Sequence, residues 1–438
     1  MKTWFRVKKG EETGDRLLVH PELIKSFELT GNTKVTLRFG LQTCDVRVIP
    51  SSKINLGKMI LSGDVIQKLM LPLIPAYEVV YRDNEIQIGP IIGIVAAKKI
   101  GKLEEKVQKL GRYVRKYHKV NGAIIAFSNE GIDFDKKLVF GYLYDPFDKR
   151  WVKGIYPYPA AIFKKASLDK ELHRHFENII GNRIFNSSTF NKWEMYSWFK
   201  NTSELNEYLP ETKMFKQFND VDHMTEQFGS AYIKPIKGMQ GKKVAKVEKW
   251  NEGLMIQYIE EDTKKDYFFK DLLDAREFLQ GTFKEGKFII QQPLNLRFNE
   301  SIIDFRVIMV KDQTRKWKNY GVMGRNGVNG HIVSNRHRGG KVEQAHITLK
   351  KMFPEKVNEY MKEMDQLARK AANTIENCGF HFGKLGIDIG IDKDGRMWLI
   401  EINHRNPNDY VATFAGDRTL VNKIRLANMR YAKKLAGF

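Results

Sequence analysis

Short segments in which apolar and polar residues alternate dominate the first part of the chain. The alternation over residues 33–39, and again over 44–49, predicts β-strands that bury one face. At Gly89 and Pro90 this pattern stops, and an unbroken apolar run over 91–97 follows. Such a run indicates a strand buried on both faces, as in a parallel sheet. Residues 1–88 are therefore predicted to form a small β-rich module.

The next part of the chain combines strand and helix patterns. The apolar strand at 91–97 precedes a polar helical stretch over 103–118 and a second apolar strand over 122–128. Strand, helix and strand at this spacing are typical of an α/β layer. The character of the sequence changes again near Ile184, so residues 89–184 are predicted to form an α/β domain.

Residues 185–438 are predicted to form the largest domain. Ser188 or Thr189 is expected to cap a helix that carries Trp193, Met195, Trp198 and Phe199. The pattern after this helix predicts strands between 231 and 259, a helix over 270–280, strands over 287–291 and 301–310, a Gly/Asn-rich loop over 321–340, a helix over 354–377, a hairpin over 384–403 and a final basic helix over 420–435. The predicted fold class is therefore α/β.

The hairpin at 384–403 carries the most informative polar residues. Asp394 and Gly395 lie between two alternating segments, which favours a two-residue type I′ turn and places Asp388 opposite Glu401. One face of this hairpin is expected in the core, and it carries Ile387, Ile389, Ile391, Trp398, Ile400 and Ile402. The other face carries Gly386, Asp388, Gly390, Glu401 and Asn403.

Two carboxylates that face each other across a strand pair repel, because their Cβ atoms are about 5 Å apart. At an effective dielectric constant of 20 this repulsion is of order 3 kcal/mol. A divalent cation removes the repulsion, and the oxygens of Asp388, Glu401 and Asn403 are ligands that Mg²⁺ prefers. The two glycines would leave room for a bulky ligand. The pattern thus predicts a magnesium site, with a solvent-exposed polar face as the alternative.

Candidate phosphate-binding residues precede the hairpin. Lys234 lies on a predicted strand before the loop at 238–241, whose glycines can turn backbone N–H groups toward phosphate oxygens. A plain basic hairpin explains this segment equally well. Asp304 and Arg306 share one face of the 301–310 strand. An arginine in such a position more often belongs to a structural ion pair than to a catalytic site. Further anion-binding capacity lies in the following loop, at Arg325, Asn335, Arg336 and Arg338.

The composition narrows the class of protein. Of the 438 residues 42% are hydrophobic and 29% are charged, which indicates a globular chain and excludes a wholly disordered one. Two cysteines, Cys44 and Cys378, cannot form a disulfide framework or a zinc site by themselves. No apolar run approaches the ~20 residues that span a bilayer, and the N-terminus has no leader pattern. We therefore expect a cytoplasmic protein without a membrane span.

The charge favours anionic partners. Lysine and arginine number 74 against 52 aspartate and glutamate residues, which gives a formal net charge of +22. This excess is spread along the chain, and no stacking or groove-reading motif accompanies it. We therefore expect no specific binding to nucleic acid.

The order of the candidate pieces resembles that of the ATP-grasp superfamily. The pieces follow one another between about 185 and 415. They are a helix with a lysine, a strand with a lysine and a glycine loop, an apolar strand ending in Gln291-Gln-Pro-Leu, an Asp-Phe-Arg strand and a final Glu-Ile-Asn. Three further segments and the β-rich module resemble the YheC/YheD family, the endospore coat-associated ATP-grasp proteins of spore-forming bacteria: Gly89-Pro-Ile-Ile-Gly-Ile, Phe190-Asn-Lys-Trp and Leu209-Pro-Glu-Thr. The resemblance implies an ATP-grasp domain at 185–438, preceded by a pre-ATP-grasp domain at 89–184 and the module at 1–88.

The resemblance also implies roles for individual residues. Nucleotide phosphates would be held by Lys192, Lys234, Lys237, Gly238, Gln240 and Gly241. Adenine would be read by the backbone of Gln291, Gln292 and Leu294, although Pro293 lacks a donor and many relatives carry an acidic residue near this hinge. One or two Mg²⁺ ions, or Mn²⁺ in their place, would be held by Asp388, Glu401 and Asn403. The transferred phosphate would face Arg306, with Arg325 and Asn335 nearby.

The implied activity is ATP-dependent ligation of a carboxylate to an amine. The carboxylate attacks the γ-phosphate, and a nucleophile then displaces phosphate from the acyl phosphate. Expected substrates are small-molecule or peptide carboxylates and amines, and acidic spore-coat or envelope components are further expected partners. Two alternatives are a kinase that phosphorylates a hydroxyl group and a basic structural coat protein with a vestigial nucleotide site. The implied location is the cytoplasm or the spore coat.

Overall fold

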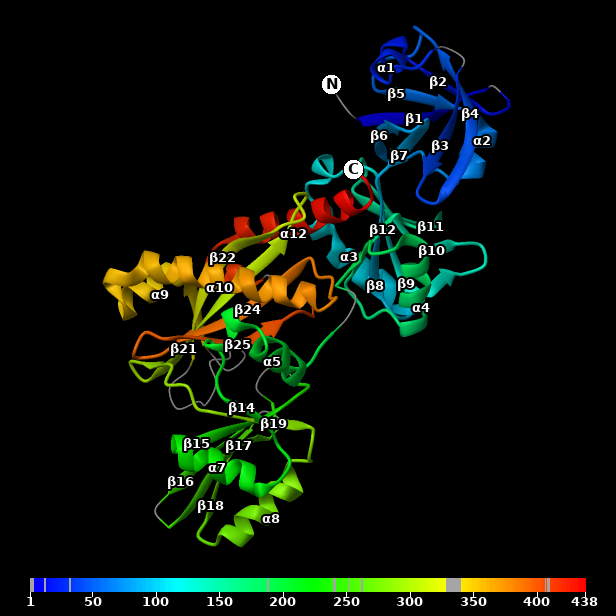
Figure 1. The fold of residues 1–438 in the computed structure, drawn as a ribbon. Helices are drawn as coiled ribbons and strands as arrows, with labels where there is room; N and C mark the ends of the chain where they lie inside the picture. Colours follow the sequence, from blue (N-terminus) through cyan, green and yellow to red (C-terminus); the bar gives the residue numbers. More distant parts are fainter. Residues whose placement is uncertain are drawn as a thin grey trace.

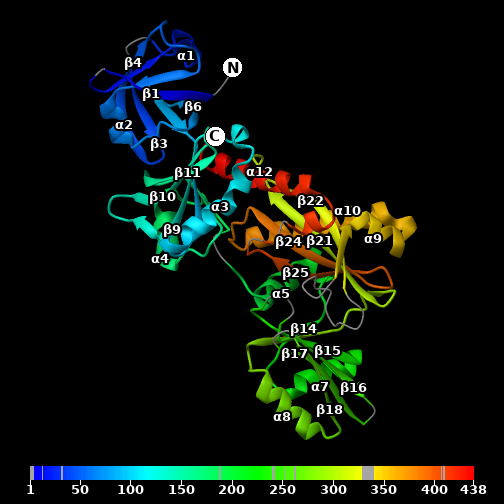
Figure 2. The same cartoon turned by 180° about the vertical axis from the view of Figure 1, so that it is seen from behind.

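The computed structural model describes residues 4–11, 13–30, 33–186, 189–238, 242–250, 252–260, 263–327, 340–405, 407 and 410–438. In this part of the chain a closed barrel and three open sheets follow one another in sequence order (Figures 1 and 2). None of the helices in these ranges combines the length and the apolar character needed to cross a membrane.

The first sheet closes into a barrel, with the strand order β1-β5-β2-β4-β3-β7-β6. Its interior is filled by alternate side chains such as Val35, Leu37 and Phe39, as the alternating pattern predicts. Its elements are β1 (Trp4–Lys9), β2 (Arg16–Val19), α1 (Pro21–Ser26), β3 (Lys34–Phe39), β4 (Gln42–Pro50), β5 (Lys58–Leu61), α2 (Gly63–Leu69), β6 (Ala76–Arg82) and β7 (Glu85–Gly89).

The second sheet has the order β11-β10-β9-β8-β12-β13. All seven residues of β8 are buried, and this strand pairs in parallel with β9 and β12, which confirms the prediction from its apolar run. The elements of this layer are β8 (Ile91–Ala97), η1 (Ile100–Lys102), α3 (Leu103–Val114), η2 (Tyr117–Lys119), β9 (Ala123–Asp133), β10 (Leu138–Asp145), β11 (Arg150–Pro157), β12 (Ala161–Lys164), α4 (Lys170–Ile180) and β13 (Ile184–Phe185).

The third sheet has the order β14-β19-β15-β16-β17-β18. Its inner side chains, among them Ala231, Ile233 and Ile256, form a core with residues of α7 and α8. The elements of this part are α5 (Lys192–Lys200), α6 (Ser203–Asn206), β14 (Thr212–Met214), α7 (Phe218–Phe228), β15 (Ser230–Pro235), β16 (Ala245–Trp250), β17 (Gly253–Glu260), β18 (Thr263–Phe269), α8 (Leu272–Thr282) and β19 (Phe288–Gln291).

The cap of α5 corrects the prediction from sequence. Asn191, rather than Ser188 or Thr189, is the N-cap residue, because its side chain accepts hydrogen bonds from the backbone N–H groups of Trp193 and Glu194. The Glu194 side chain in turn accepts from the N–H of Asn191 at 2.7 Å, which completes a capping box.

The fourth sheet has the order β23-β22-β21-β24-β25, and β20 pairs with β21 at one end. A loop was expected over 321–340, but β22 continues to Asn326, and residues 328–339 lie outside the described residues. The elements are β20 (Arg297–Phe298), β21 (Ser301–Lys311), β22 (Trp317–Asn326), β23 (Lys341–Gln344), α9 (Ala345–Met352), η4 (Pro354–Lys356), α10 (Val357–Asn377), β24 (Lys384–Ile391), β25 (Met397–Asn403), α11 (Tyr410–Phe414) and α12 (Arg418–Leu435).

Two long helices cover the two faces of this fourth sheet. Phe305, Val307 and Met309 of β21 belong to a core that α10 completes, whereas Ile308 and Val310 belong to a core that α12 completes. Asp304 and Arg306 share the face of Ile308, because side chains alternate along a strand. This face of β21 is therefore polar in its first half and covered by α12 in its second half.

The last helix, α12, belongs to two cores. Its first half contributes Leu420, Val421, Ile424 and Ala427 to the core under β21 and β22. Its second half contributes Met429, Tyr431, Ala432 and Leu435 to the core of the barrel and the second sheet. Figure 1 shows α12 (red) running between the fourth sheet and the second layer.

The β24–β25 hairpin confirms that Asp388 pairs with Glu401, but by a different route from the predicted type I′ turn. Asp392 N–H donates to the carbonyl of Arg396, so the loop has three residues and ends with Gly395 at φ +84°. A β-bulge between Asp388 and Ile389 then restores the predicted pairing. The bulge also pairs Ile389 with Leu399, so Leu399 and Met397 lie in the core where Trp398 and Ile400 were expected.

Candidate nucleotide and metal site

The candidate site is built from residues that lie side by side on neighbouring strands. Arg306 of β21 pairs in register with Asp388 of β24, and Asp388 pairs in turn with Glu401 of β25. Asp304 of β21 pairs in register with Arg325 of β22. Directly paired residues have Cβ atoms about 5 Å apart, so side chains of these four strands meet on one face of the sheet.

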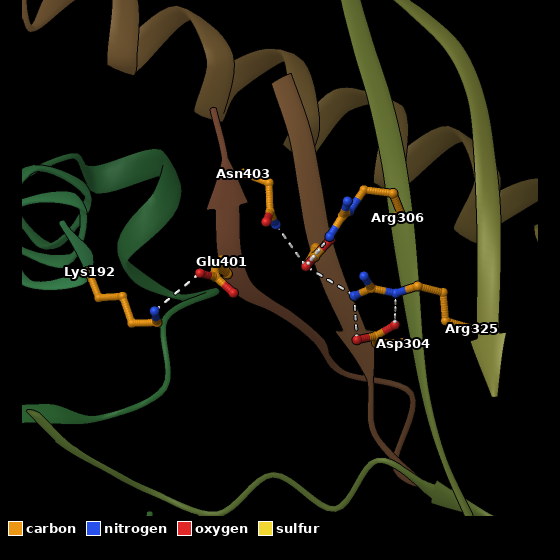
Figure 3. A network of polar contacts seen from close by, with 7 residues as sticks. Lys192, Asp304, Arg306, Arg325, Glu401 and Asn403 are labelled. Atoms are coloured by element: carbon orange, nitrogen blue, oxygen red, sulfur yellow. Dashed lines mark hydrogen bonds and ion pairs between the residues drawn. The ribbon is translucent and has the colours of Figure 1, made fainter. Parts of the chain in front are cut away.

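Asp388 is the centre of this polar cluster, because Arg306, Arg325 and Asn403 all contact its carboxylate. Figure 3 labels these three partners. Arg306 donates to both of its carboxylate oxygens, at 2.8 Å from Nη2 to Oδ2. Arg325 Nη2 and Asn403 Nδ2 each lie 3.0 Å from the same Oδ2. Burial alone would raise the pKa of Asp388, but the charges of Arg306 and Arg325 outweigh it and hold this pKa below its usual value. The carboxylate is therefore ionised and fully engaged.

Asp304 holds Arg325 from the other side. Its two oxygens accept from Nε and Nη2 of Arg325, each at 2.6 Å, which is a bidentate contact. Burial would lower the pKa of the Arg325 guanidinium, but the charges of Asp304 and Asp388 raise it further than burial lowers it. Asp304 thus pairs across the strands with Arg325, and Arg306 pairs across the strands with Asp388. Each of the two residues of β21 therefore has its ion-pair partner on a neighbouring strand.

Glu401 faces a different cation. Its Oε1 lies 3.2 Å from Nζ of Lys192, the first residue of α5 (Figure 3). Lys192 Nζ also donates to the carbonyl oxygen of Gly238, at 3.2 Å, in the segment that follows β15. Lys192 therefore connects the start of the glycine loop with the strand that carries Glu401.

Lys234 lies beside these groups on β15. Its Nζ donates to Oε1 of Gln291 at 2.6 Å, and Gln291 Nε2 donates to Thr212 at 3.0 Å. Burial, with the nearby charge of Lys192, lowers the pKa of Lys234 to about 8, although Glu401 acts in the opposite direction. The structure thus brings together Lys192, Lys234, Gln291 and Glu401.

Three other predicted contact residues, Lys237, Gln292 and Leu294, are described by the structure, and three more lie outside the described residues. Lys237 is exposed, and Gln292 Oε1 accepts the backbone N–H of Glu211 at 2.7 Å, so this side chain binds the protein itself. Leu294 is half-buried in the segment between β19 and β20. Gln240, Gly241 and Asn335 lie outside the described residues.

The sequence pattern predicted that the two hairpin glycines leave room for a ligand, and this prediction is wrong. A Cβ at Gly390 would lie 2.7 Å from the side chain of Leu296, and one at Gly386 would lie 3.0 Å from the side chain of Arg306. The space over both glycines is therefore filled by the protein. Gly386 lets Arg306 reach across to Asp388, which is a function of the site that the sequence pattern did not indicate.

His404, which the analysis of the sequence missed, supports this site. Its ring stacks on Phe190, with centroids 4.0 Å apart, and its Nε2 accepts the N–H of Phe190 at 3.3 Å. Burial lowers the pKa of His404 to about 4, so the ring is neutral near pH 7. The ring fixes the segment before α5 against the end of β25. Its position directly after Glu-Ile-Asn was the available signal.

The donor chemistry of the cluster fits a divalent cation. Asp388, Glu401 and Asn403 offer hard oxygen ligands from neighbouring strands, and the guanidinium and ammonium groups now stand where positive charge is required. Within the described ranges, however, no three His, Cys, Asp or Glu side chains already converge as a metal cluster. The donor set is thus suitable in kind, with its carboxylates held by basic side chains of the protein.

Comparison with known proteins identifies the family. The sequence model of the YheC/D-like ATP-grasp domain matches residues 181–435, more than half of the chain. The chain belongs to this ATP-grasp family. It is 25% identical over 371 residues to the endospore coat-associated protein YheD of Bacillus subtilis strain 168, covering 79% of each chain. It is 20% identical over 219 residues to YheC of the same strain, covering 49% of this chain and 59% of YheC.

Solved structures are also similar to the chain. The ATP-grasp ligase PsnB, in complex with a phosphomimetic variant of its minimal precursor, Mg and ADP, aligns with a TM-score of 0.45 and 12% identity, over 77% of this chain and 98% of PsnB. The VanG D-Ala:D-Ser ligase of Enterococcus faecalis aligns with a TM-score of 0.42 and 14% identity, over 79% of this chain and 98% of VanG.

Proposed function

We propose that this ATP-grasp protein is a ligase that uses ATP and Mg²⁺ to join a carboxylate to an amine. The observation that carries the proposal is the polar face of the fourth sheet, where Asp388, Glu401 and Asn403 lie beside Arg306 and Arg325. Membership of the ATP-grasp family supports ATP as the nucleotide. Mn²⁺ binds the same kind of oxygen ligands and would take the place of Mg²⁺.

In this proposal, lysines from two elements bind the triphosphate. Lys192 at the start of α5 and Lys234 on β15 hold its phosphates, and Gly238 lies beside Lys192. Gln291, Gln292 and Leu294 line the adenine end with their backbone groups. When it is bound to Asp388, Glu401 and Asn403, Mg²⁺ offsets negative charge on the phosphates.

The reaction begins when a substrate carboxylate attacks the γ-phosphorus of ATP, which forms an acyl phosphate and releases ADP. An amine then attacks the acyl carbon, phosphate leaves, and an amide forms. The part of Arg306 and Arg325 is to stabilise the negative oxygens of the phosphoryl group while it is transferred. Asp304 keeps the Arg325 guanidinium oriented through its bidentate contact.

The biological setting is proposed from the relatives. YheD and YheC carry the description endospore coat-associated, which favours a substrate or partner in the spore coat or envelope. The chemistry requires a carboxylate and an amine, and either a peptide or a small molecule can supply each of these groups.

The first test is calorimetric titration of the full chain with Mg²⁺ and a non-hydrolysable ATP analogue. We expect binding, and we expect D388N and E401Q to weaken it by about tenfold or more, because each removes a charged ligand. D45N, which changes an exposed carboxylate of the barrel, is the matched control and should bind like the unchanged chain.

Absence of measurable binding at millimolar nucleotide would overturn the proposal and leave the structural coat protein as the explanation. Product analysis separates the two enzymatic alternatives. A ligase releases free phosphate and forms an amide, whereas a kinase leaves a phosphoester on a hydroxyl group.

A further inference from the structure

A turn at the far end of β21 lies between the two helices that cover the fourth sheet. β21 ends at Lys311 and β22 begins at Trp317, so residues 312–316 form this turn. α10 packs on one face of these strands and α12 on the other. Lys311 lies five residue steps along the strand from Arg306, or about 17 Å, so the turn lies well away from the candidate site.

A cavity of about 320 Å³ lies on the α10 side of the turn. It is lined by Arg315, Lys316, Trp317, Arg369, Asn373 and Glu376. The only carboxylate among these lining residues is already neutralised, because Glu376 accepts from Lys311 and from Nε1 of Trp317. Arg315 and Lys316 are exposed, and neither forms an ion pair within the described part of the chain.

A second hollow, of about 170 Å³, lies on the α12 side of the same turn. It is lined by Gln313, Tyr320, Lys423, Leu426, Ala427 and Arg430. Lys423 is exposed and Arg430 is half-exposed, and both are without an ion-pair partner among the residues that the structure describes. Leu426 and Ala427 give this hollow an aliphatic part, whereas the first one has only Trp317 as an apolar lining residue.

The positive charge around the turn is not balanced locally. α12 contributes Lys423 and Arg430 to this region, and it carries no aspartate or glutamate along its length. The nearby carboxylates are engaged, because Asp312 pairs with Lys318 at 2.7 Å and Asp365 pairs with Arg369 at 2.7 Å. Like charges gathered in this way repel, and an anionic partner relieves the repulsion.

The side chains favour a polypeptide over a nucleic acid as this partner. Single-stranded nucleic acids bind on exposed aromatic rings. Trp317 is only 5% exposed and its indole N–H is already used, and Tyr320, the aromatic residue of the second hollow, is half-buried against the core under β21 and β22. Two small separate hollows, one of them partly aliphatic, fit side chains better than a continuous backbone of phosphates. Arginine and lysine at both hollows match carboxylates in charge and geometry.

We infer that Arg315, Lys316, Lys423 and Arg430, together the basic turn surface, dock an acidic polypeptide segment that also carries apolar side chains. Carboxylates of this segment pair with the four cations, and an apolar side chain packs on Leu426 and Ala427. The inference does not depend on the proposed ligase activity, because the surface lies at the opposite end of β21 from Asp304 and Arg306.

The test measures fluorescence anisotropy of a labelled synthetic peptide of glutamate pairs separated by leucine, titrated with the full chain at about 0.15 M salt. We expect saturable binding. The variant with R315S, K316S, K423S and R430S should bind at least about tenfold more weakly, because it loses four exposed ion pairs. Thermal unfolding of the variant establishes that it is folded.

The control variant removes four exposed cations elsewhere and changes the net charge equally. It carries K8S, K53S, R82S and K106S, and it should keep its affinity within about twofold. Equal losses in the two variants would overturn the inference, because binding would then reflect overall charge. Absence of binding to the peptide would overturn the inference. The inference would also be overturned if a single-stranded oligonucleotide bound more tightly than the peptide and only the first variant abolished that binding.

Discussion

The two arginines of the polar face differ in how firmly they are held. Arg325 lies between Asp304 and Asp388, whereas Arg306 has Asp388 as its carboxylate partner in the described part of the chain. If Asp388 turns to a metal ion, Arg325 keeps one carboxylate and Arg306 keeps none. In the proposed reaction, Arg306 would then be the arginine that turns toward a bound phosphate, whereas Arg325 would stay held by Asp304.

Substitution of Asp304 tests this arrangement. In D304N the shape of the side chain is kept, but the buried Arg325 guanidinium loses a bidentate carboxylate. We expect the free energy of unfolding to fall by about 3 kcal/mol, measured by chemical denaturation. D45N removes an exposed partner of Lys34 and should leave the midpoint unchanged. If D304N is as stable as D45N, Asp304 does not hold Arg325.

These pairs mark what the sequence can predict at the scale of residues. It indicated which residue types would matter, because Asp388, Glu401 and Asn403 lie on one hairpin with a recognisable turn. It did not indicate that Arg306 pairs with Asp388, since the two are 82 positions apart and meet only when β21 joins β24. Partners across strands depend on sheet order, and sheet order comes from the whole domain.

At the scale of elements, the β24–β25 hairpin combines two deviations that cancel. The loop is one residue longer than the predicted turn, and the bulge beside Ile389 compensates for it, so Asp388 still faces Glu401. The alternating pattern predicted the strands well, because burial of one face determines it. The bulge escaped prediction because Trp398 and Ile400 are as apolar as Met397 and Leu399.

Glycine substitutions test how closely this hairpin packs on the segment after β19. G390A places a Cβ 2.7 Å from Leu296, so we expect a loss of about 1–3 kcal/mol in the free energy of unfolding. G111A in α3 is the matched control, because no atom lies within 4 Å of the added Cβ. It should stabilise the protein by about 0.5–1 kcal/mol. Equal effects of the two changes would contradict close packing at Gly390.

At the scale of the whole molecule, α12 holds distant segments together. Tyr431 of α12 hydrogen-bonds to Nε2 of His381 at 2.6 Å, and Lys433 pairs with Glu78 of the barrel. The composition of α12 predicted a basic helix, and the structure confirms the helix. The segments that α12 contacts were not predictable from the sequence. Its apolar residues indicate that one side of the helix is buried, but the same pattern is compatible with packing on any core.

Acid should weaken this junction. Burial lowers the pKa of His381 to about 4, whereas an unfolded histidine has a pKa near 6.5. The unfolded chain therefore binds more protons between pH 6.5 and 4, so stability falls as the pH falls through this range. H381Q should reduce this slope by up to about 1.4 kcal/mol per pH unit, measured by denaturation at several pH values.

The same substitution at His346, which is exposed on α9, is the control for the change itself. A slope that is identical in H381Q and in the unchanged protein would show that the folded protein takes up a proton at His381 as readily as the unfolded chain.

The division of α12 between two cores has a practical consequence for anyone who isolates the ATP-grasp region. A fragment cut at residue 181 would contain the whole matched family region and still leave Met429, Ala432 and Leu435 without the neighbours that bury them. Such a fragment would expose apolar side chains along its last helix and would tend to aggregate. Its aggregation during purification would then say nothing about whether the intact protein is an enzyme.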